Sequence, residues 1–425
     1  MIVSPAFRGK RYAVLGLARS GLATVRALVA SGAHVVAWDS KDDARASVGD
    51  GVTLSDPLEI DLTGFDGVVV SPGVPINRHP IADKAHAANV PLIGDIELFS
   101  QARPSLPPHK VIGITGTNGK STTTALIHHI VETAGIPARL GGNIGLPILG
   151  QEPLPEGGVY VLELSSYQID LCHALDCDIA VLLNITPDHL DRYDGFADYA
   201  APKERLFTMQ HVDKVAVIAT EDDRTKMIAS RINHRLMRVS SKQVGDQSRW
   251  PSLQGPHNAQ NVAAARAVAE VLGIKASTIE EALHTYPGLP HRMERVRELG
   301  GVVYVNDSKA TNPTSTAPAL AAFPAIHWIL GGRAKTSELD ACVPYFGHVR
   351  AAYTIGESAG MFASLLKGSM PVSECGSLDI AVRAASKAAV AGETVLLSPA
   401  CASFDQFTDF EARGDAFRVA VEALA

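Results

Sequence analysis

The sequence has few cysteines, no excess of basic residues and no long apolar run. Its five cysteines are odd in number and form no CxxC pair, which argues against a disulfide framework or a structural zinc site and fits a reducing compartment. The count of 38 Lys and Arg against 45 Asp and Glu gives a net charge of −7, so no basic field indicates a nucleic-acid partner. The apolar run at 13–18 is too short for a signal peptide or a membrane span. We expect a cytoplasmic monomer without stable membrane insertion.

The length of 425 residues predicts two or three domains, because one hydrophobic core rarely serves so long a chain. Apolar runs alternate with glycine-rich or polar loops and helix-like segments, which indicates an α/β protein with mostly parallel sheets. A proline-rich seam at 104–108 is a compositional linker, although the first border could lie earlier, near Gly94. We expect domains at 1–94, 95–288 and 289–425. Strands are expected at 12–15, 34–38, 68–70, 111–114, 159–162, 179–183, 302–305, 327–330, 352–355 and 394–397, with helices at 20–31, 123–134 and 259–272.

A glycine-rich loop between a buried strand and a helix is the strongest local signal. Its glycines let several backbone N–H groups face one anion, and the helix N-terminus adds partial positive charge. Lys120 can reach the β- and γ-phosphates of a nucleotide, and the Ser121 hydroxyl can ligate magnesium. The strict phosphate-loop pattern has glycine where this chain has Ile114, so the loop is a variant. The expected ATP-binding residues of the loop are Gly116, Thr117, Asn118, Gly119, Lys120, Ser121 and Thr122.

Polar residues follow the next expected strands, where parallel sheets display their chemistry. Glu163 comes directly after the strand at 159–162, and Asn184 and His189 follow the strand at 179–183. A divalent metal that accompanies ATP prefers oxygen ligands. Alone, a histidine such as His189 is more often a surface residue than a ligand, but the phosphate loop and Glu163 favour a metal site here.

The first block contains Gly16, Ala18 and Gly21 in an arrangement that resembles a dinucleotide fingerprint, with Asp39 after the second strand. An NAD-dependent oxidoreductase is therefore an alternative from a different class. Ala18 stands where a glycine would let the backbone approach a pyrophosphate, and no acid or base for hydride transfer lies nearby in the sequence.

Nine motifs in a fixed order resemble the Mur ligase family, and the last two are particular to its D-glutamate-adding branch. Another Mur ligase or a folylpolyglutamate synthase-like ligase is the close alternative, although a folate enzyme would lack the nucleotide-sugar block. The motifs lie at 116–122, 142–145, 163–168, 184 with 188–191, 255–261, 291–292, 307–312, 331–335 and 398–407.

The resemblance implies three domains: a Rossmann-like nucleotide-sugar domain, a central P-loop ATPase domain and a Rossmann-like C-terminal domain. It also implies a reaction. ATP phosphorylates the L-alanine carboxylate of UDP-N-acetylmuramoyl-L-alanine, and the amine of D-glutamate attacks the acyl phosphate in peptidoglycan precursor synthesis. If ATP contacts both the central and C-terminal blocks, a closing motion should assemble the active site.

The resemblance also assigns metal and ATP residues, with two magnesium ions expected. Ser121 and Glu163 would hold one magnesium, and His189 would help to hold a second. Lys203 matches a lysine that carbon dioxide carbamylates, although without the family match it would be an ordinary surface lysine, and Pro202 restricts the backbone before it. The residues expected to carry catalysis are Lys120, Glu163, His189, Lys203, Asp307 and Lys309. Those expected to add to the ATP site are Asn258 (which could instead cap its helix), Asn261, Arg292, Asp307 and Lys309.

Two further substrate sites follow from the resemblance. Lys335 with Thr311 would bind one glutamate carboxylate, and Ser403 with backbone near Phe404 and Phe410 the other, although both phenylalanines are equally plausible as core. Charged and hydroxyl donors suit such a dicarboxylic amino acid. The residues expected to bind the UDP-sugar are Arg19, Ser20, Asp39, Ser40, Ser71, Gly73, Asn143, Ser165 and His189, with Lys41 near the uracil and ribose.

Overall fold

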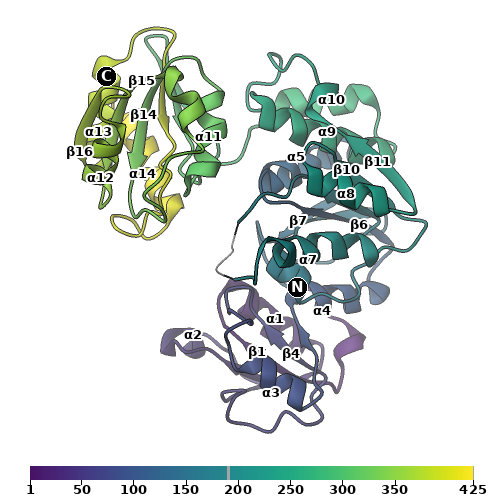
Figure 1. Ribbon diagram of the computed structural model, residues 1–425. Helices are drawn as coiled ribbons and strands as arrows, with labels where there is room; N and C mark the ends of the chain where they lie inside the picture. Colours follow the sequence, from purple (N-terminus) through teal and green to yellow (C-terminus); the bar gives the residue numbers. More distant parts are fainter. Residues whose placement is uncertain (189–191, 425) are drawn as a thin grey trace. The chain divides into compact units, whose positions relative to one another are not determined.

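The computed structural model describes residues 1–188 and 192–424 (Figure 1). The chain forms two compact units. The first unit comprises Met1–Gln243 and Gln260–Leu283, and the second unit comprises Val244–Ala259 and His284–Ala425. Within the described ranges, no helix is both long and apolar enough to cross a membrane.

The first unit contains a five-stranded parallel sheet in the order β3-β2-β1-β4-β5. The central strand, β1, is buried from Tyr12 to Leu15, as expected for a parallel strand whose two faces are both covered. Gly16 turns the chain at φ 91°, and a Cβ on Gly21 would lie 1.9 Å from the Gly16 carbonyl oxygen, so α1 packs directly on this turn. The elements are β1 (Arg11–Leu15), α1 (Arg19–Ala30), β2 (His34–Trp38), α2 (Asp42–Ala46), β3 (Val52–Leu54), β4 (Gly67–Val70), α3 (Ile81–Ala87) and β5 (Leu92–Ile93).

A second, six-stranded parallel sheet of the same unit has the order β11-β10-β9-β6-β8-β7. The neighbouring strands β8, β6 and β9 end at Glu163, Thr115 and Leu182, so the loops that follow them share one edge. The elements are α4 (Asp95–Ala102), β6 (His109–Thr115), α5 (Lys120–Thr133), β7 (Ala138–Gly142), β8 (Gly158–Glu163), α6 (Ser166–Asp170), β9 (Ile179–Leu182), α7 (Phe196–Thr208), β10 (Val215–Ala219), α8 (Asp223–Arg231) and β11 (Arg235–Val239). Most of α9 (Pro256–Val271) and of α10 (Ala276–Thr285) also belongs to this unit, from Gln260 to Leu283.

Helix α7 continues through Pro202. A proline inside a helix removes one backbone hydrogen bond and usually kinks or ends the helix. Here the flanking residues Tyr199, Leu206 and Phe207 are buried, so packing holds the helix on both sides of the proline. Lys203 therefore lies on a buried face of α7 and is not the surface lysine that its neighbours Glu204 and Arg205 suggest.

The second unit is built on a six-stranded sheet in the order β12-β13-β17-β14-β15-β16, in which β12 runs antiparallel and the other pairs are parallel. Strands β13 and β17 are neighbours, so the loops after Asn306 and Leu397 leave the sheet side by side. The elements are β12 (Glu294–Leu299), β13 (Val302–Asn306), α11 (Pro313–Ala321), β14 (Ile326–Gly331), β15 (Val349–Ile355), α12 (Ala359–Leu366), β16 (Val372–Gly376), α13 (Leu378–Ala388), β17 (Thr394–Leu397) and α14 (Phe410–Glu422).

The expected α/β architecture with largely parallel sheets is confirmed, and each predicted strand corresponds to a strand of the structure. Helix α5 begins at Lys120, three residues before the predicted start, because Gly119 with φ 83° ends the loop and caps the helix. The proposed domain borders at 94/95 and 288/289 remain predictions.

Candidate active site

The phosphate loop connects β6 to α5 in the first unit. Gly116 has φ 154° and Gly119 has φ 83°, values that L side chains rarely adopt. A Cβ on Gly119 would lie 2.4 Å from the Asn261 side-chain oxygen, so a larger residue would also clash with α9. The loop thus has the backbone curl and the adjoining helix N-terminus that bind anions.

Several side chains hold this loop in place. The Asn118 N–H donates to the Asn184 side-chain oxygen at 2.8 Å, and the Asn184 amide donates back to the Asn118 carbonyl at 3.1 Å. The Lys120 ammonium donates to the carbonyl oxygens of Gly116 at 2.9 Å and Thr117 at 2.8 Å. Asn184, which follows β9, therefore supports the loop, and the Lys120 side chain folds back onto the loop's own carbonyl groups.

Glu163 ends β8 and is 2% exposed. One carboxylate oxygen accepts a hydrogen bond from the Asn143 amide at 2.8 Å, and the other has no hydrogen-bond partner among the described residues. An unpaired buried carboxylate oxygen is costly unless another group satisfies it. Ser121, 4% exposed in the first turn of α5, adds a hydroxyl oxygen.

These oxygens fit magnesium. No group of three or more His, Cys, Asp or Glu residues in the described part of the chain could hold a metal ion. Magnesium bound with a nucleotide does not require such a group, because it takes one or two protein oxygens and completes its shell with phosphate oxygens and water. Glu163 and Ser121 are therefore suitable ligands, and the metal would supply positive charge against the phosphates.

Lys203 is 1% exposed and lies over the Tyr199 ring, with 4.4 Å from its nitrogen to the ring centroid. Burial, and to a lesser extent the charge of Lys120, lower its pKa to about 7, whereas the charges of Asp188 and Asp170 oppose the shift. The structure thus brings Lys203 into the electrostatic environment of the phosphate loop. His189, the predicted ligand of a second metal, lies outside the described residues.

A cavity of about 520 Å³ in the first unit is lined by residues that follow strands of both of its sheets. This volume is typical of small-molecule sites. Asp39 lies on its wall. Burial raises the pKa of Asp39, but its carboxylate accepts hydrogen bonds from the N–H groups of Leu17 at 2.7 Å and Lys41 at 3.0 Å. These bonds stabilise the charged form, and the net effect lowers the pKa. Of the predicted UDP-sugar residues, those that line the cavity are Arg19, Ser20, Asp39, Ser71, Gly73 and Asn143.

Among the described residues, two of those predicted to bind the UDP-sugar are not in that cavity wall. Ser40 is exposed and is absent from the lining. Ser165 caps α6, where its hydroxyl accepts from the Gln168 N–H at 3.3 Å and the Gln168 side-chain oxygen accepts from the Ser165 N–H at 3.2 Å. This capping box explains why serine stands at the start of α6. Gln168, the partner of Ser165, lines the cavity instead of Ser165.

Asn258 and Asn261 are both buried on α9. The Asn258 amide donates to the Gln254 carbonyl at 3.0 Å, a contact with the chain that leads into the helix, as the capping interpretation expects. Asn261 accepts from the Thr123 hydroxyl at 3.1 Å and faces Gly119, so it contacts the phosphate loop and the first turns of α5.

In the second unit, Asp307 follows β13 and is buried. Burial raises its pKa to about 7, although hydrogen bonds from the Ser398 hydroxyl at 2.8 Å and the Met293 N–H at 3.2 Å, and the charge of Arg292, favour the carboxylate. Lys309 lies 3.8 Å from the centre of the Phe410 ring, a cation–π contact. Arg292, Asp307 and Lys309 therefore belong to one neighbourhood of this unit.

The predicted glutamate residues have different environments. Ser403 is 2% exposed. Lys335 is exposed, and its positive charge opposes the rise in the pKa of the Cys401 thiol that burial causes. Thr311 is half-buried and its N–H donates to the Lys309 carbonyl at 2.8 Å. Phe404 is 64% exposed, so the alternative that it belongs to the core is wrong, whereas the Phe410 ring is half-buried against Lys309.

Three residues of these neighbourhoods were missed by the sequence reasoning. Asp95 lines the 520 Å³ cavity, Tyr199 accepts or donates a hydrogen bond with Thr117 of the phosphate loop at 3.1 Å, and Arg413 is buried beside Ser308. Each lies on a helix, outside the motifs that the sequence indicates. No local pattern could have identified them, because their burial comes from distant segments.

Comparison with known proteins agrees with this site. The chain matches the Mur ligase middle domain over residues 114–251 and the Mur ligase, glutamate ligase domain over residues 291–401. It is 64% identical over 432 residues to the UDP-N-acetylmuramoylalanine–D-glutamate ligase of Sphingopyxis alaskensis, and 56% identical over 440 residues to that of Zymomonas mobilis, with 100% of both chains covered in each case.

Solved structures share the fold at low identity. The MurF ligase of Thermotoga maritima in complex with ADP has a TM-score of 0.64 at 15% identity and covers 100% of this chain and 96% of its own. A MurF of Acinetobacter baumannii has a TM-score of 0.60 at 16% identity, with 98% and 92% covered. The domain matches and the full-length D-glutamate ligase relatives leave the oxidoreductase and folate-ligase alternatives without support. The chain belongs to the Mur ligase family of ATP-dependent, amide-bond-forming ligases.

Proposed function

We propose that this protein joins D-glutamate to UDP-N-acetylmuramoyl-L-alanine with ATP, as a cytoplasmic monomer that makes a peptidoglycan precursor. The observation that carries the proposal is the pair Asn143 and Glu163. Asn143 lines the cavity assigned to the UDP-sugar and donates to the Glu163 carboxylate, whose second oxygen is left for a metal. The acceptor and the magnesium–ATP sites would therefore meet at Asn143.

The chain's own residues suit an acyl-phosphate reaction. The γ-phosphoryl group passes to the L-alanine carboxylate, ADP leaves, and the glutamate amine then attacks the acyl carbon. The tetrahedral intermediate loses phosphate and a proton to give the amide. Lys120, once released from the loop carbonyls, would neutralise the transferring phosphoryl group.

Magnesium would supply charge stabilisation between the phosphates and the acceptor carboxylate. Glu163 and Ser121 would hold one ion. Lys203 as a carbamate and His189 would support a second. Asp307 and Lys309, with Arg292, would orient ATP from the second unit, and Asn258 and Asn261 its adenosine.

The amino acid would bind to the second unit. Lys335 and Thr311 would bind one glutamate carboxylate, and Ser403 with backbone near Phe404 and Phe410 the other. The 64% identity over the full length of a D-glutamate ligase supports this choice of amino acid. Five free cysteines support a reducing compartment.

The test measures phosphate release with ATP, magnesium and UDP-N-acetylmuramoyl-L-alanine, with D-glutamate, L-glutamate or lysine offered in turn. We expect turnover with D-glutamate alone. A Lys120→Ala variant should lose most of this activity and serves as the control for contaminating phosphatases. Turnover with lysine, and none with D-glutamate, would contradict the proposal.

A further inference from the structure

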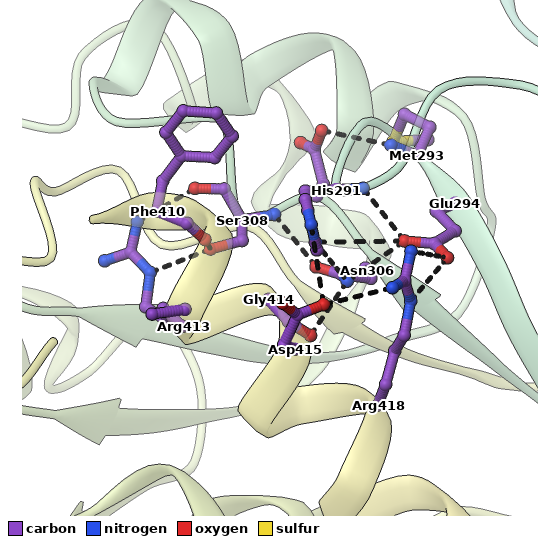
Figure 2. Close-up of polar contacts among 12 residues, drawn as sticks. His291, Met293, Glu294, Asn306, Ser308, Phe410, Arg413, Gly414, Asp415 and Arg418 are labelled. Atoms are coloured by element: carbon purple, nitrogen blue, oxygen red, sulfur yellow. Dashed lines mark hydrogen bonds and ion pairs between the residues drawn. The ribbon is translucent and has the colours of Figure 1, made fainter. Parts of the chain in front are cut away.

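Arg413 is a buried arginine on α14 that contacts two loops of the second unit. Its side chain is 1% exposed. Its Nε donates to the Ser308 hydroxyl at 3.0 Å, and its Nη2 donates to the carbonyl oxygens of Ser308 at 2.8 Å and Cys401 at 3.0 Å. Figure 2 shows Arg413 directed at Ser308 from the first turns of α14. One guanidinium therefore connects the loop after β13 to the loop after β17.

The two loops carry residues of different substrates in the proposed function. Ser308 lies between Asp307 and Lys309, which are assigned to ATP and catalysis. Cys401 lies two residues before Ser403, which is assigned to glutamate. Because β13 and β17 are paired strands, the two loops leave the sheet side by side. How far each loop extends relative to the other depends on the contacts that connect the loops to each other outside the sheet.

Helix α14 holds the first loop at more than one point. The Ser308 hydroxyl donates to the Phe410 carbonyl at 2.8 Å while it accepts from Arg413. The Asn306 amide donates to the Gly414 carbonyl at 3.1 Å (Figure 2). A Cβ on Gly414 would lie 2.1 Å from the His291 ring, so α14 packs this closely against the segment before β12 only with glycine at that position.

The buried environment of Arg413 is energetically unfavourable for a cation. Burial lowers the pKa of Arg413 to about 10, although the Asp405 charge opposes this shift, and the group stays charged at neutral pH. Its Nη1 has no hydrogen-bond partner among the described residues. A buried, partly satisfied charge is weak evidence for a stabilising contribution, whereas the planar fork of arginine is well suited to fixing two acceptors at once. The arrangement therefore favours a positioning effect.

We propose that Arg413 is a positioning residue that fixes the position of the Asp307–Lys309 loop relative to the Cys401–Ser403 loop. By doing so it aligns the glutamate amine with the acyl phosphate. The proposal rests on the proposed function of the two loops. Arg413 acts through Ser308 and Cys401 and touches no substrate. A misplacement of about 1 Å in such an alignment can cost about 100-fold in rate.

The test compares wild type with Arg413→Lys. This variant keeps the positive charge but loses the planar guanidinium that donates to several acceptors at once. We expect kcat/KM for D-glutamate to fall about 100-fold, with kcat reduced and KM for glutamate raised. The KM for the UDP-sugar should stay within about twofold, because its cavity is built entirely from the first unit. Arg383→Lys, an exposed arginine paired with Asp379 on α13, is the matched control and should leave all constants unchanged.

Ser308→Ala is the second variant, and it removes only the hydroxyl contacts to Arg413 and Phe410. It should raise KM for glutamate several-fold, and the double variant should cost less than the sum of the two single effects because both act on one contact. Constants for Arg413→Lys within twofold of wild type, or KM values raised equally for all three substrates, would overturn the proposal. If Arg413→Lys does not fold, unchanged constants for Ser308→Ala overturn it. Absence of wild-type turnover with D-glutamate would instead contradict the proposed function.

Discussion

Lys203 shows how burial changes the chemistry of a single residue. In water a lysine amine is almost fully protonated at pH 7. Removal of Lys203 from water, together with the positive charge of Lys120, brings its pKa to about 7, so that about half of the amine is neutral at that pH. A neutral amine can attack carbon dioxide. The new N–C bond forms, one C–O π bond of carbon dioxide opens to a carboxylate, a proton leaves to solvent, and the neutral amine becomes a carbamate anion.

We predict that activity depends on dissolved carbon dioxide through Lys203. Removal of carbon dioxide should lower turnover, and bicarbonate should restore it. At equal dissolved carbon dioxide, recovery should be weaker at pH 6 than at pH 8, because fewer amines are neutral below the pKa of about 7. A Lys203→Ala variant should lose about 10- to 100-fold in activity, as expected for a group that supports a metal.

The control for this prediction is Lys226→Ala on α8, an exposed lysine paired with Asp223. This variant should keep both the activity and its dependence on carbon dioxide. Small carboxylates such as formate should restore part of the activity of Lys203→Ala, since they can supply the missing negative charge. Wild-type turnover that is indifferent to carbon dioxide at both pH values would exclude the carbamate.

At the scale of one element, α4 begins with a carboxylate whose position has two opposing effects. A helix N-terminus usually favours an anion by about 0.3–1 kcal/mol. Asp95 is 5% exposed, and burial raises its pKa from 3.8 to about 6, although the Ile96 N–H at 3.0 Å and the Gln168 side chain favour the charged form. The shift corresponds to about 3 kcal/mol, so desolvation outweighs the helix end.

We predict that this carboxylate makes the protein less stable as pH rises from about 4 to about 6. The folded state binds the Asp95 proton more tightly than the unfolded state, so deprotonation costs stability in that window, and the loss is complete above about pH 6. Relative to Asp95→Asn, the wild-type melting temperature should fall by several degrees between pH 4.5 and pH 7.5. Scanning fluorimetry measures this difference.

Asp83→Asn on α3 is the matched control, because Asp83 is exposed on a helix of the same unit. The difference between this variant and wild type should not change with pH. If the difference for Asp95→Asn is also constant across the range, Asp95 does not titrate as we infer.

At the scale of the whole molecule, the candidate residues are divided between the two compact units. The phosphate loop, Glu163 and Lys203 belong to the first unit, whereas Asp307 and Lys335 belong to the second. Neither unit alone contains every residue assigned to ATP. Enzymes with such divided sites commonly complete them by closure on the substrate, which also excludes water.

We predict that ATP with the UDP-sugar lowers the radius of gyration of the chain in solution. Small-angle scattering of the wild type with and without both ligands measures this change. Lys120→Ala, which removes the main phosphate contact of the first unit, should show a smaller change at the same ligand concentrations. Unchanged dimensions of wild type at saturating ligands would contradict closure.

The phosphate loop was predictable from the sequence because all its determinants are close together along the chain. An apolar strand, glycines at 116 and 119 and a helix-forming segment determine the turn by local sterics. The same holds for the strand pattern, since parallel strands covered on both faces need continuous apolar runs. The turn at Gly16 and the packing at Gly21 were likewise visible as a fingerprint, although not which nucleotide it serves.

The burial and the pKa values of the charged residues could not be predicted from the sequence, because they depend on the tertiary structure. Lys203, Asp95 and Arg413 lie on helices, and the segments that bury them come from elsewhere in the chain. The sequence by itself determined the sheets, the phosphate loop and the family, because local sterics and ordered motifs suffice for these. Only the tertiary structure decided which charged groups leave water, since burial and pKa depend on every neighbouring segment at once.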